Sequence, residues 1–171
     1  MNLLAQKIIQ LKGTLAGGAS PREIVEVEER LQAVLPKELK EFLLLHNGTM
    51  EDTDEGVWRF WPCAEITSSQ AYRGQEERVI DYSELSLLGV EGSEVKLPAS
   101  RLILFADAMV DAATYGVFVS PGHPWDGMIF DDANGYVSAR NMEEWIRAFV
   151  EQAESGLIIS GADENDTILR G

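Results

Sequence analysis

The segment from Leu35 to Gly48 constrains the fold most, because its apolar residues recur at the spacing of one helical face. The residues at positions i, i+3, i+4 and i+7 of this segment are Leu39, Phe42, Leu43 and His46. Pro36 marks the start of the helix, since proline has no N–H to donate to a preceding turn. Asn47 and Gly48 both tolerate the left-handed backbone conformation that ends many helices. We therefore interpret His46–Asn47–Gly48 as a helix terminus and not as a catalytic sequence.

Helices are also predicted on either side of this block. An additional amino-terminal helix within residues 1–17 ends at Gly17–Gly18, and the residues of its buried face are Leu4, Ile8, Leu11 and Leu15. Ser20–Pro21–Arg22–Glu23 then combines an N-cap serine, a proline at the first helical position and a glutamate that completes a capping box. A carboxy-terminal helix is expected to begin at its cap, Asn141, and to end at Gly156.

Strands are predicted mainly in the last third of the chain. Their β-branched and aromatic composition indicates strands at residues 57–61, 101–106, 115–119, 127–130 and 136–138. Asn134–Gly135 lies between the last two and favours a tight hairpin turn, because both residues accept a positive φ. Residues 62–100 are interpreted as a long connection, with a short helix near Tyr82–Leu88.

The order of these elements indicates the fold class. Helices come first, strands follow and one helix closes the chain, which is typical of an α+β domain. We expect one domain over residues 1–171, with a largely antiparallel central sheet packed by the amino-terminal helices and the carboxy-terminal helix. Residues 157–171 are expected to form an acidic tail.

The charge of the chain bears on its partners. Its 29 acidic and 14 basic residues give a net charge of −15. This field repels nucleic-acid backbones and anionic lipids and favours a basic protein partner, although an acidic surface also serves solubility alone. No apolar run reaches the roughly 20 residues of a membrane span, and the first residues lack the basic region of a signal peptide. Because Cys63 is the single cysteine, no intrachain disulfide can form, and we expect a cytoplasmic protein.

The residues that could carry chemistry are few. His46, His123 and Cys63 stand singly on separate predicted elements, so neither a metal site nor a cofactor is expected. An enzyme would become plausible only if His123, Cys63 and an aspartate met in one pocket. The sequence from Asp131 to Gly135 resembles a calcium loop, but its twelfth position is Asn141 in place of the required carboxylate. We interpret it as a hairpin turn.

Two groups of aromatic residues have different predicted roles. Trp58, Phe60 and Trp61 are expected in the core, because clustered aromatic side chains dominate core burial. Trp125 lies in a loop rich in proline and glycine. It is either an anchor at a protein interface or a ring folded back onto the sheet.

Several of these blocks together resemble one known family. The acidic helical sequence Val25-Glu26-Val27-Glu28-Glu29-Arg30-Leu31 precedes Leu35-Pro36-Lys37-Glu38-Leu39-Lys40-Glu41-Phe42-Leu43 and His46-Asn47-Gly48. Leu104-Phe105-Ala106-Asp107 and the helix Met142–Phe149 follow. From about residue 24 to 150 this order is similar to the SUKH superfamily, which includes the Smi/Knr-type regulators of fungal cell-wall assembly and many bacterial relatives. The chain departs from the family at residues 108–114, where relatives often carry a Gly-Gly-Asp-like loop.

The resemblance implies binding and no catalysis. Bacterial members of the superfamily are mostly immunity proteins that neutralise secreted toxins, often nucleases, and fungal members are regulatory interaction modules. We therefore expect an immunity protein that binds a basic toxin domain, with a regulatory scaffold for several partners as the alternative. The predicted partner-binding residues are Glu51, Asp52, Asp54, Glu55, Asp107, Asp111, Trp125 and Asp126.

Overall fold

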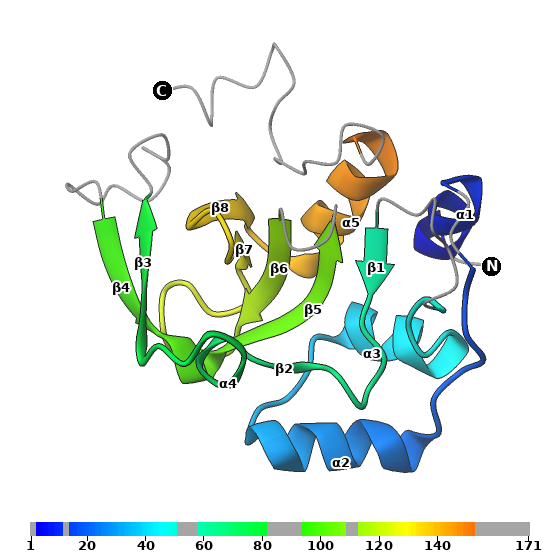
Figure 1. Cartoon of the computed structure of the whole chain (residues 1–171), viewed down its shortest axis with the longest axis horizontal. Helices are drawn as coiled ribbons and strands as arrows, with labels where there is room; N and C mark the ends of the chain where they lie inside the picture. The colour runs from blue at the N-terminus through cyan, green and yellow to red at the C-terminus, as the bar shows by residue number, and fades with distance from the viewer. Residues whose placement is uncertain (1–2, 12–13, 51–57, 82–93, 109–112, 153–171) are drawn as a thin grey trace.

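A computed structural model describes residues 3–11, 14–50, 58–81, 94–108 and 113–152, which form helices around one mixed sheet (Figure 1). The helices are α1 (Leu3–Gln10), α2 (Pro21–Leu31), α3 (Lys37–Leu45), the short α4 (Ser69–Arg73), the 3-10 turn η2 (Ala99–Arg101) and α5 (Met142–Gln152). The strands are β1 (Trp58–Phe60), β2 (Thr67–Ser68), β3 (Glu77–Asp81), β4 (Glu94–Pro98), β5 (Leu102–Ala108), β6 (Ala113–Phe118), β7 (Ile129–Asp131) and β8 (Tyr136–Ala139). The predicted α+β class is confirmed.

The sheet has the strand order β1-β5-β6-β7-β8-β3-β4, with β2 paired to the same edge of β5 as β1. Neighbouring strands run antiparallel except β3 and β8, which are parallel and share the single register pair Asp81 and Tyr136. Strands β5 to β8 follow one another in sequence and in space, so they form an antiparallel meander. The predicted hairpin between β7 and β8 is confirmed, and Gly135 has a φ of 73° there.

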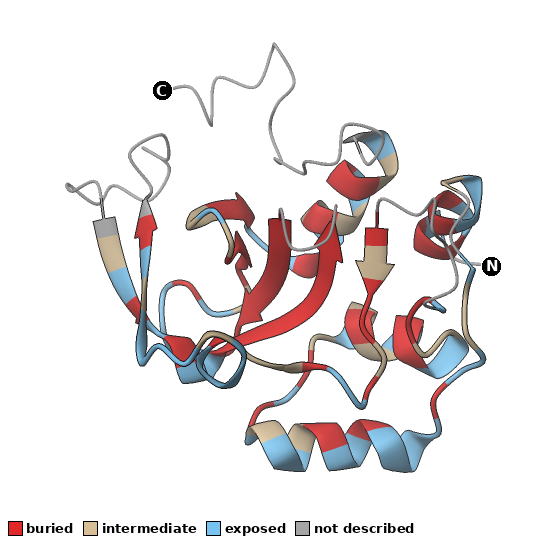
Figure 2. Cartoon of the chain, in the orientation of Figure 1, coloured by how far each residue is buried: buried red, intermediate tan, exposed pale blue. Residues whose placement is uncertain are grey.

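The core is one cluster, in which α1, α2, α3 and α5 pack with the sheet. Every residue of β5 and β6 is buried, as Figure 2 shows in red. Trp145 and Phe149 of α5 pack against aromatic rings on one face of the sheet, with Phe149 4.9 Å from Trp58 and 5.3 Å from Phe60 between ring centroids. The prediction that these strand aromatics belong to the core is therefore confirmed.

The predicted start signals of α2 and α5 are present as hydrogen bonds. At α2, the Ser20 hydroxyl accepts the Glu23 N–H at 3.2 Å, and the Glu23 carboxylate accepts the Ser20 N–H at 2.8 Å. At α5, the Asn141 side chain accepts the Glu144 N–H at 2.9 Å. These contacts satisfy backbone donors that have no partner inside the helix.

The end of α3 differs in detail from the prediction. Its last cap residue, His46, is extended, with a φ of −147°, so no left-handed residue directly follows the helix. The left-handed residue is Gly48, with a φ of 82°. A Cβ atom there would lie 2.6 Å from the Phe60 carbonyl oxygen, so glycine is needed for two reasons. The segment ends the helix as predicted. It does so through a turn in which Gly48 lies against the backbone of β1.

Two other sequence expectations are wrong. The first helix ends at Gln10 and does not extend to Leu15, which instead forms a bridge with Thr49. Residues 62–100 are not simply a connection, because they contain β2, α4, β3, β4 and η2. The expected helix at Tyr82–Leu88 and the expected helix end at Gly156 lie outside the described residues.

Candidate partner-binding groove and buried polar row

Polar side chains form a row across the sheet on the face opposite α5. Asp107 of β5 is in register with Arg59 of β1 and with Thr114 of β6, and residues in register point to the same face. Asp132 extends the row just beyond β7, where its N–H donates to the Thr114 carbonyl at 2.6 Å. We call Asp107, Thr114 and Asp132 the polar row.

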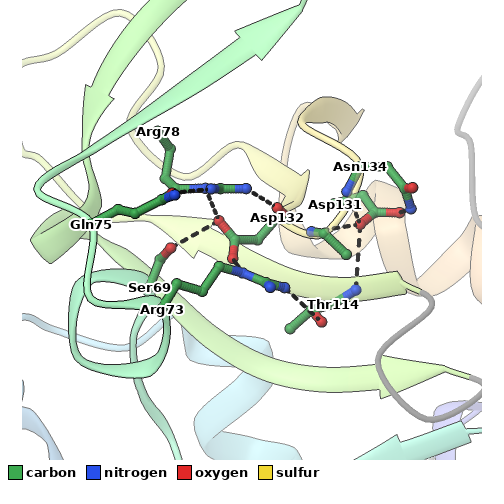
Figure 3. A network of polar contacts seen from close by, with 9 residues as sticks. Ser69, Arg73, Gln75, Arg78, Thr114, Asp131, Asp132 and Asn134 are labelled. Atoms are coloured by element: carbon green, nitrogen blue, oxygen red, sulfur yellow. Dashed lines mark hydrogen bonds and ion pairs between the residues drawn. The ribbon is translucent and has the colours of Figure 1, made fainter.

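Asp132 lies at one end of the polar row, and its carboxylate is fully buried. One carboxylate oxygen accepts the Ser69 hydroxyl at 2.9 Å and Arg78 Nε at 2.7 Å, and the other accepts Arg73 Nε (Figure 3). Arg73 also reaches Thr114 Oγ1 at 3.2 Å. Buried charges are tolerated only when they are paired and hydrogen-bonded, and this carboxylate meets both conditions. The network fastens α4 and β3 to the turn after β7.

The neighbouring Asp131 explains the sequence that resembled a calcium loop. Its carboxylate accepts the N–H groups of Thr114, Ala133 and Asn134 at 3.3, 3.0 and 3.2 Å, and the Asn134 side-chain amide at 2.8 Å. These donors come from the protein itself and shape the turn. Within the described parts of the chain, no group of His, Cys, Asp or Glu side chains has the arrangement of a metal site.

Asp107, a predicted partner-binding residue, lies in the interior at the other end of the polar row. Its Oδ2 accepts the indole N–H of Trp61 at 2.5 Å and lies 3.8 Å from Arg59 Nη1. The Trp61 ring in turn lies 5.3 Å from the Tyr72 ring. The structure therefore places the Asp107 carboxylate against the protein and not on an open surface.

The residues considered for nucleophilic or histidine chemistry are engaged in local packing. Cys63 is buried, and burial raises the pKa of its thiol. Its N–H donates to the Asn47 side chain at 2.8 Å. The His46 ring lies 6.1 Å from that of Phe42, and His123 Nδ1 accepts the Trp125 N–H at 3.1 Å. A buried thiol with a raised pKa is a poor nucleophile.

The loop after β6 places its two predicted site residues differently. Trp125 folds back onto the sheet, the second of the two alternatives, and stacks on Phe130 with ring centroids 5.8 Å apart. Asp126 is exposed and accepts the Ser120 N–H at 2.7 Å. The remaining predicted site residues, Glu51, Asp52, Asp54, Glu55 and Asp111, lie outside the described residues.

Strand register separates the predicted site residues into two groups. Asp107 lies next to the pair Ala108 and Ala113, at the end of β5 and β6 that adjoins residues 109–112. Trp58, which follows residues 51–57, pairs with Ala108 at the same end. The loop that carries Asp126 begins after Phe118, which pairs with Leu102 at the opposite end. The structure does not bring Asp126 together with Asp107.

An open groove of about 640 Å³ lies at this opposite end, between α2 and the loop 119–127. Figure 1 shows α2 lying beyond this end of β5 and β6. One wall consists of α2 and the turn after it, including Val25, Glu29 and Val34. The other wall includes Pro121 and Asp126, and the floor includes residues of β6.

The α2 wall is shaped by an unusual backbone conformation. Gln32 caps α2 with a φ of 50°, and among the described residues it is the single non-glycine residue with positive φ. Its carbonyl accepts Arg101 Nη1 at 3.2 Å, which ties the cap to η2. The chain turns here and leaves Val34 67% exposed at the groove. Sequence reasoning missed this groove, because its walls are about 90 residues apart in the sequence and only their folding brings them together.

Comparison with known families identifies the chain's relatives. The family model of the SMI1 / KNR4 family (SUKH-1) matches residues 18–148, which is more than half of the chain and close to the range expected from the sequence. The match begins just before α2 and ends within α5, and α1 precedes it. A search of curated proteins found no match. Among the described residues, no helix is both long and apolar enough to span a bilayer. The chain therefore belongs to the SMI1/KNR4 family (SUKH-1).

Proposed function

We propose that this protein is a cytoplasmic, non-catalytic immunity protein that binds and neutralises a basic toxin domain. Membership of the SMI1/KNR4 family supports an immunity-like or Smi1/Knr4-type protein-binding module. The net charge of −15 supports a basic partner, because complementary charge speeds association and disfavours acidic competitors.

The observation that carries the proposal is the contrast between buried and exposed acidic groups. Asp107, Asp131 and Asp132 are buried and bonded to the chain's own donors, so none is open to a substrate. Glu29 and Asp126 are exposed, and both lie on the groove. Exposed acidic groups beside an open groove favour docking of a basic protein surface, because complementary charge steers association.

The proposed contact residues now fall into two sets. Direct contact is proposed for the exposed Asp126 and for five predicted site residues that lie outside the described parts of the chain, namely Glu51, Asp52, Asp54, Glu55 and Asp111. Asp107 and Trp125 are buried, so we propose that they act by holding the neighbouring segments in place.

The test is co-expression with a toxin encoded beside this protein. We expect the two proteins to purify together and the host cell to survive toxin expression only when this protein is present. Binding should weaken as salt is raised, because the attraction is partly electrostatic. If no toxin is encoded nearby and no basic protein binds tightly, the proposal is wrong. Capture of many unrelated partners from the native host, in complexes that survive high salt, would favour the scaffold alternative.

A further inference from the structure

We propose that the partner docks in the groove between α2 and the loop 119–127, through an amphipathic segment whose apolar residues are flanked by lysine or arginine. This inference rests on the proposed function in one respect, namely that the partner is a protein. It adds the place of docking and the chemistry of the segment that docks.

Each wall of the groove is held in shape by contacts within that wall. In the loop, the Asp126 carboxylate accepts the Ser120 N–H at 2.7 Å, and the Gly127 N–H donates to the Phe118 carbonyl at 2.8 Å. On the other wall, Glu28 accepts the Leu35 N–H at 2.9 Å and lies 3.1 Å from Lys40 Nζ. A surface that is already ordered loses little conformational entropy when a partner binds.

The groove presents apolar side chains to solvent. Val25 and Val34 are 50% and 67% exposed, and both lie on the α2 wall. Pro36 and Pro121 add further apolar surface, and the buried ring of Phe118 lies in the floor. Covering these side chains would remove apolar area from water, which is the main favourable term in protein association. The groove therefore fits apolar anchors on a partner.

The charge of the groove selects a basic segment. Glu28, Glu29 and Asp126 line it, and Arg101 is the one basic residue among the described residues of the lining. Glu28 is paired with Lys40, and Arg101 is bonded to the Gln32 carbonyl. The carboxylate of Glu29 has no bonding partner among the described residues. Asp126 is exposed on the facing wall, where one carboxylate oxygen accepts the Ser120 N–H and the other is available. One available acidic group on each wall would meet a lysine or arginine on either side of the apolar anchors.

The size of the groove fits a segment and not a whole domain. From Val25 to Gln32, the α2 wall spans two helical turns, or about 10 Å. A volume of about 640 Å³ is enough for several side chains. It would also be enough for a small molecule, but such sites place convergent polar groups around their ligand. Here the polar groups of Glu28 and Arg101 are already bonded to the chain itself.

The first experiment uses synthetic peptides and the full-length chain. The probe is a helical peptide with leucines on one face and lysines on the other. Its controls are a scrambled peptide of the same composition and a peptide with glutamate in place of lysine. By calorimetry at physiological salt, we expect the probe to bind at least tenfold more tightly than either control. Equal binding of the scrambled peptide would overturn the inference, because it would show attraction by charge alone.

Variants then locate the binding. Val34→Asp and Glu29→Lys should each weaken probe binding about tenfold or more, without a change in the melting temperature. The matched controls are Leu3→Asp, which alters a residue that is also 67% exposed, and Glu143→Lys on the exposed side of α5. The controls should leave binding unchanged. If the groove variants bind like the wild type, or if the controls weaken binding equally, the groove is not the docking site.

The same variants separate this inference from the proposed function. With a cognate toxin, the wild type should protect the cell, and Val34→Asp should lose protection while Leu3→Asp keeps it. Full protection by both variants would refute docking in the groove and leave the immunity function standing. Specific peptide binding in the groove without protection from any toxin would refute the immunity function and leave the groove standing as a site for another basic partner.

Discussion

The two ends of the strand pair β5 and β6 use acidic residues in opposite ways. At the end near Ala108, Asp107 and Asp132 are buried and bonded to tryptophan, serine and arginine side chains. At the end near Phe118, Asp126 and Glu29 are exposed beside the groove. The first set holds the fold together, and the second is available to a partner. Solvent access decides which role a carboxylate has, and composition alone does not reveal it.

The largest effect is expected from breaking the polar row. Asp132→Ala removes the carboxylate that pairs with Arg73 and Arg78 and leaves two largely buried guanidinium groups without it. Loss of one partner from a buried ion pair costs about 3 to 5 kcal/mol. We expect about 3 kcal/mol here, because both arginines keep some exposure to water. Urea denaturation measures the change in the free energy of unfolding.

Asp126→Asn at the groove is the matched control for Asp132→Ala. The asparagine carbonyl can still accept the Ser120 N–H, so a change below about 0.5 kcal/mol is expected. Equal losses for the two variants would contradict the contrast between the buried and the exposed end.

The second prediction compares two glycines that both have positive φ. Gly48→Ala would place a Cβ 2.6 Å from the Phe60 carbonyl oxygen, whereas the same change at Gly122 in the loop 119–127 meets nothing within 4 Å. Both variants carry the backbone cost of about 1 to 2 kcal/mol. We expect Gly48→Ala to cost at least 1 kcal/mol more than Gly122→Ala, measured as the difference in unfolding free energy. Gly48→Val should lower the melting temperature further. An unchanged melting temperature would rule out that this turn requires glycine.

The third prediction concerns the capping box that begins α2, the wall of the groove. Ser20→Ala should destabilise the protein by about 1 kcal/mol near neutral pH. Hydrogen bonds from the Ser20 backbone and side chain lower the pKa of Glu23. A lowered pKa in the folded state means that this stabilisation is present above the unfolded pKa and is lost as pH falls through the folded pKa. The difference between wild type and Ser20→Ala should therefore shrink in acid. A difference that is constant with pH would exclude a contribution from the bond between the Ser20 hydroxyl and the Glu23 carboxylate.

The smallest effect is a gain in stability at the other end of α2. Gln32→Gly relieves the cost of a left-handed residue and should stabilise the protein by about 0.5 to 1 kcal/mol. The Gln32 carbonyl that accepts Arg101 is kept, so the groove should retain its shape. Thermal unfolding measures the gain, with Gln32→Ala as the control that should show none. A loss of stability would mean that the glutamine side chain itself supports the wall.

The features that the sequence predicted correctly depend on neighbouring residues. The caps of α2 and α5 are bonds between residues three apart, from Ser20 to Glu23 and from Asn141 to Glu144. The turn at Gly135 is equally local. The apolar run that became β5 required no knowledge of its partners, because a strand buried on both faces is apolar throughout.

The features that were missed depend on residues far apart in the sequence. The polar sequence of strand β3 is typical of a connection, yet its Arg78 is bonded to Asp132, 54 residues away. The residues that neighbour Arg78 in the sequence give no indication of that contact. The burial of Asp107 likewise depends on Trp61, which follows the last residue of β1 and donates its indole N–H to the Asp107 carboxylate. The groove is formed by α2 and a loop about 90 residues later, so its residues share no local pattern.

The strand order also has a consequence for the time course of folding. Strands β5 to β8 are consecutive hairpins, whereas β1 and β2 join one side of this meander, and β3 and β4 lie beyond the other. All four of these flanking strands precede the meander in the chain. Short-range hairpins close faster than distant pairings. During synthesis, which proceeds from the amino terminus, β1 and β2 are made before their partner β5, and the paired strands β3 and β4 are made before β8, on which β3 docks. We expect β1, β2, β3 and β4 to join the sheet only after the meander has formed. This is the reverse of the order in which the strands are synthesised.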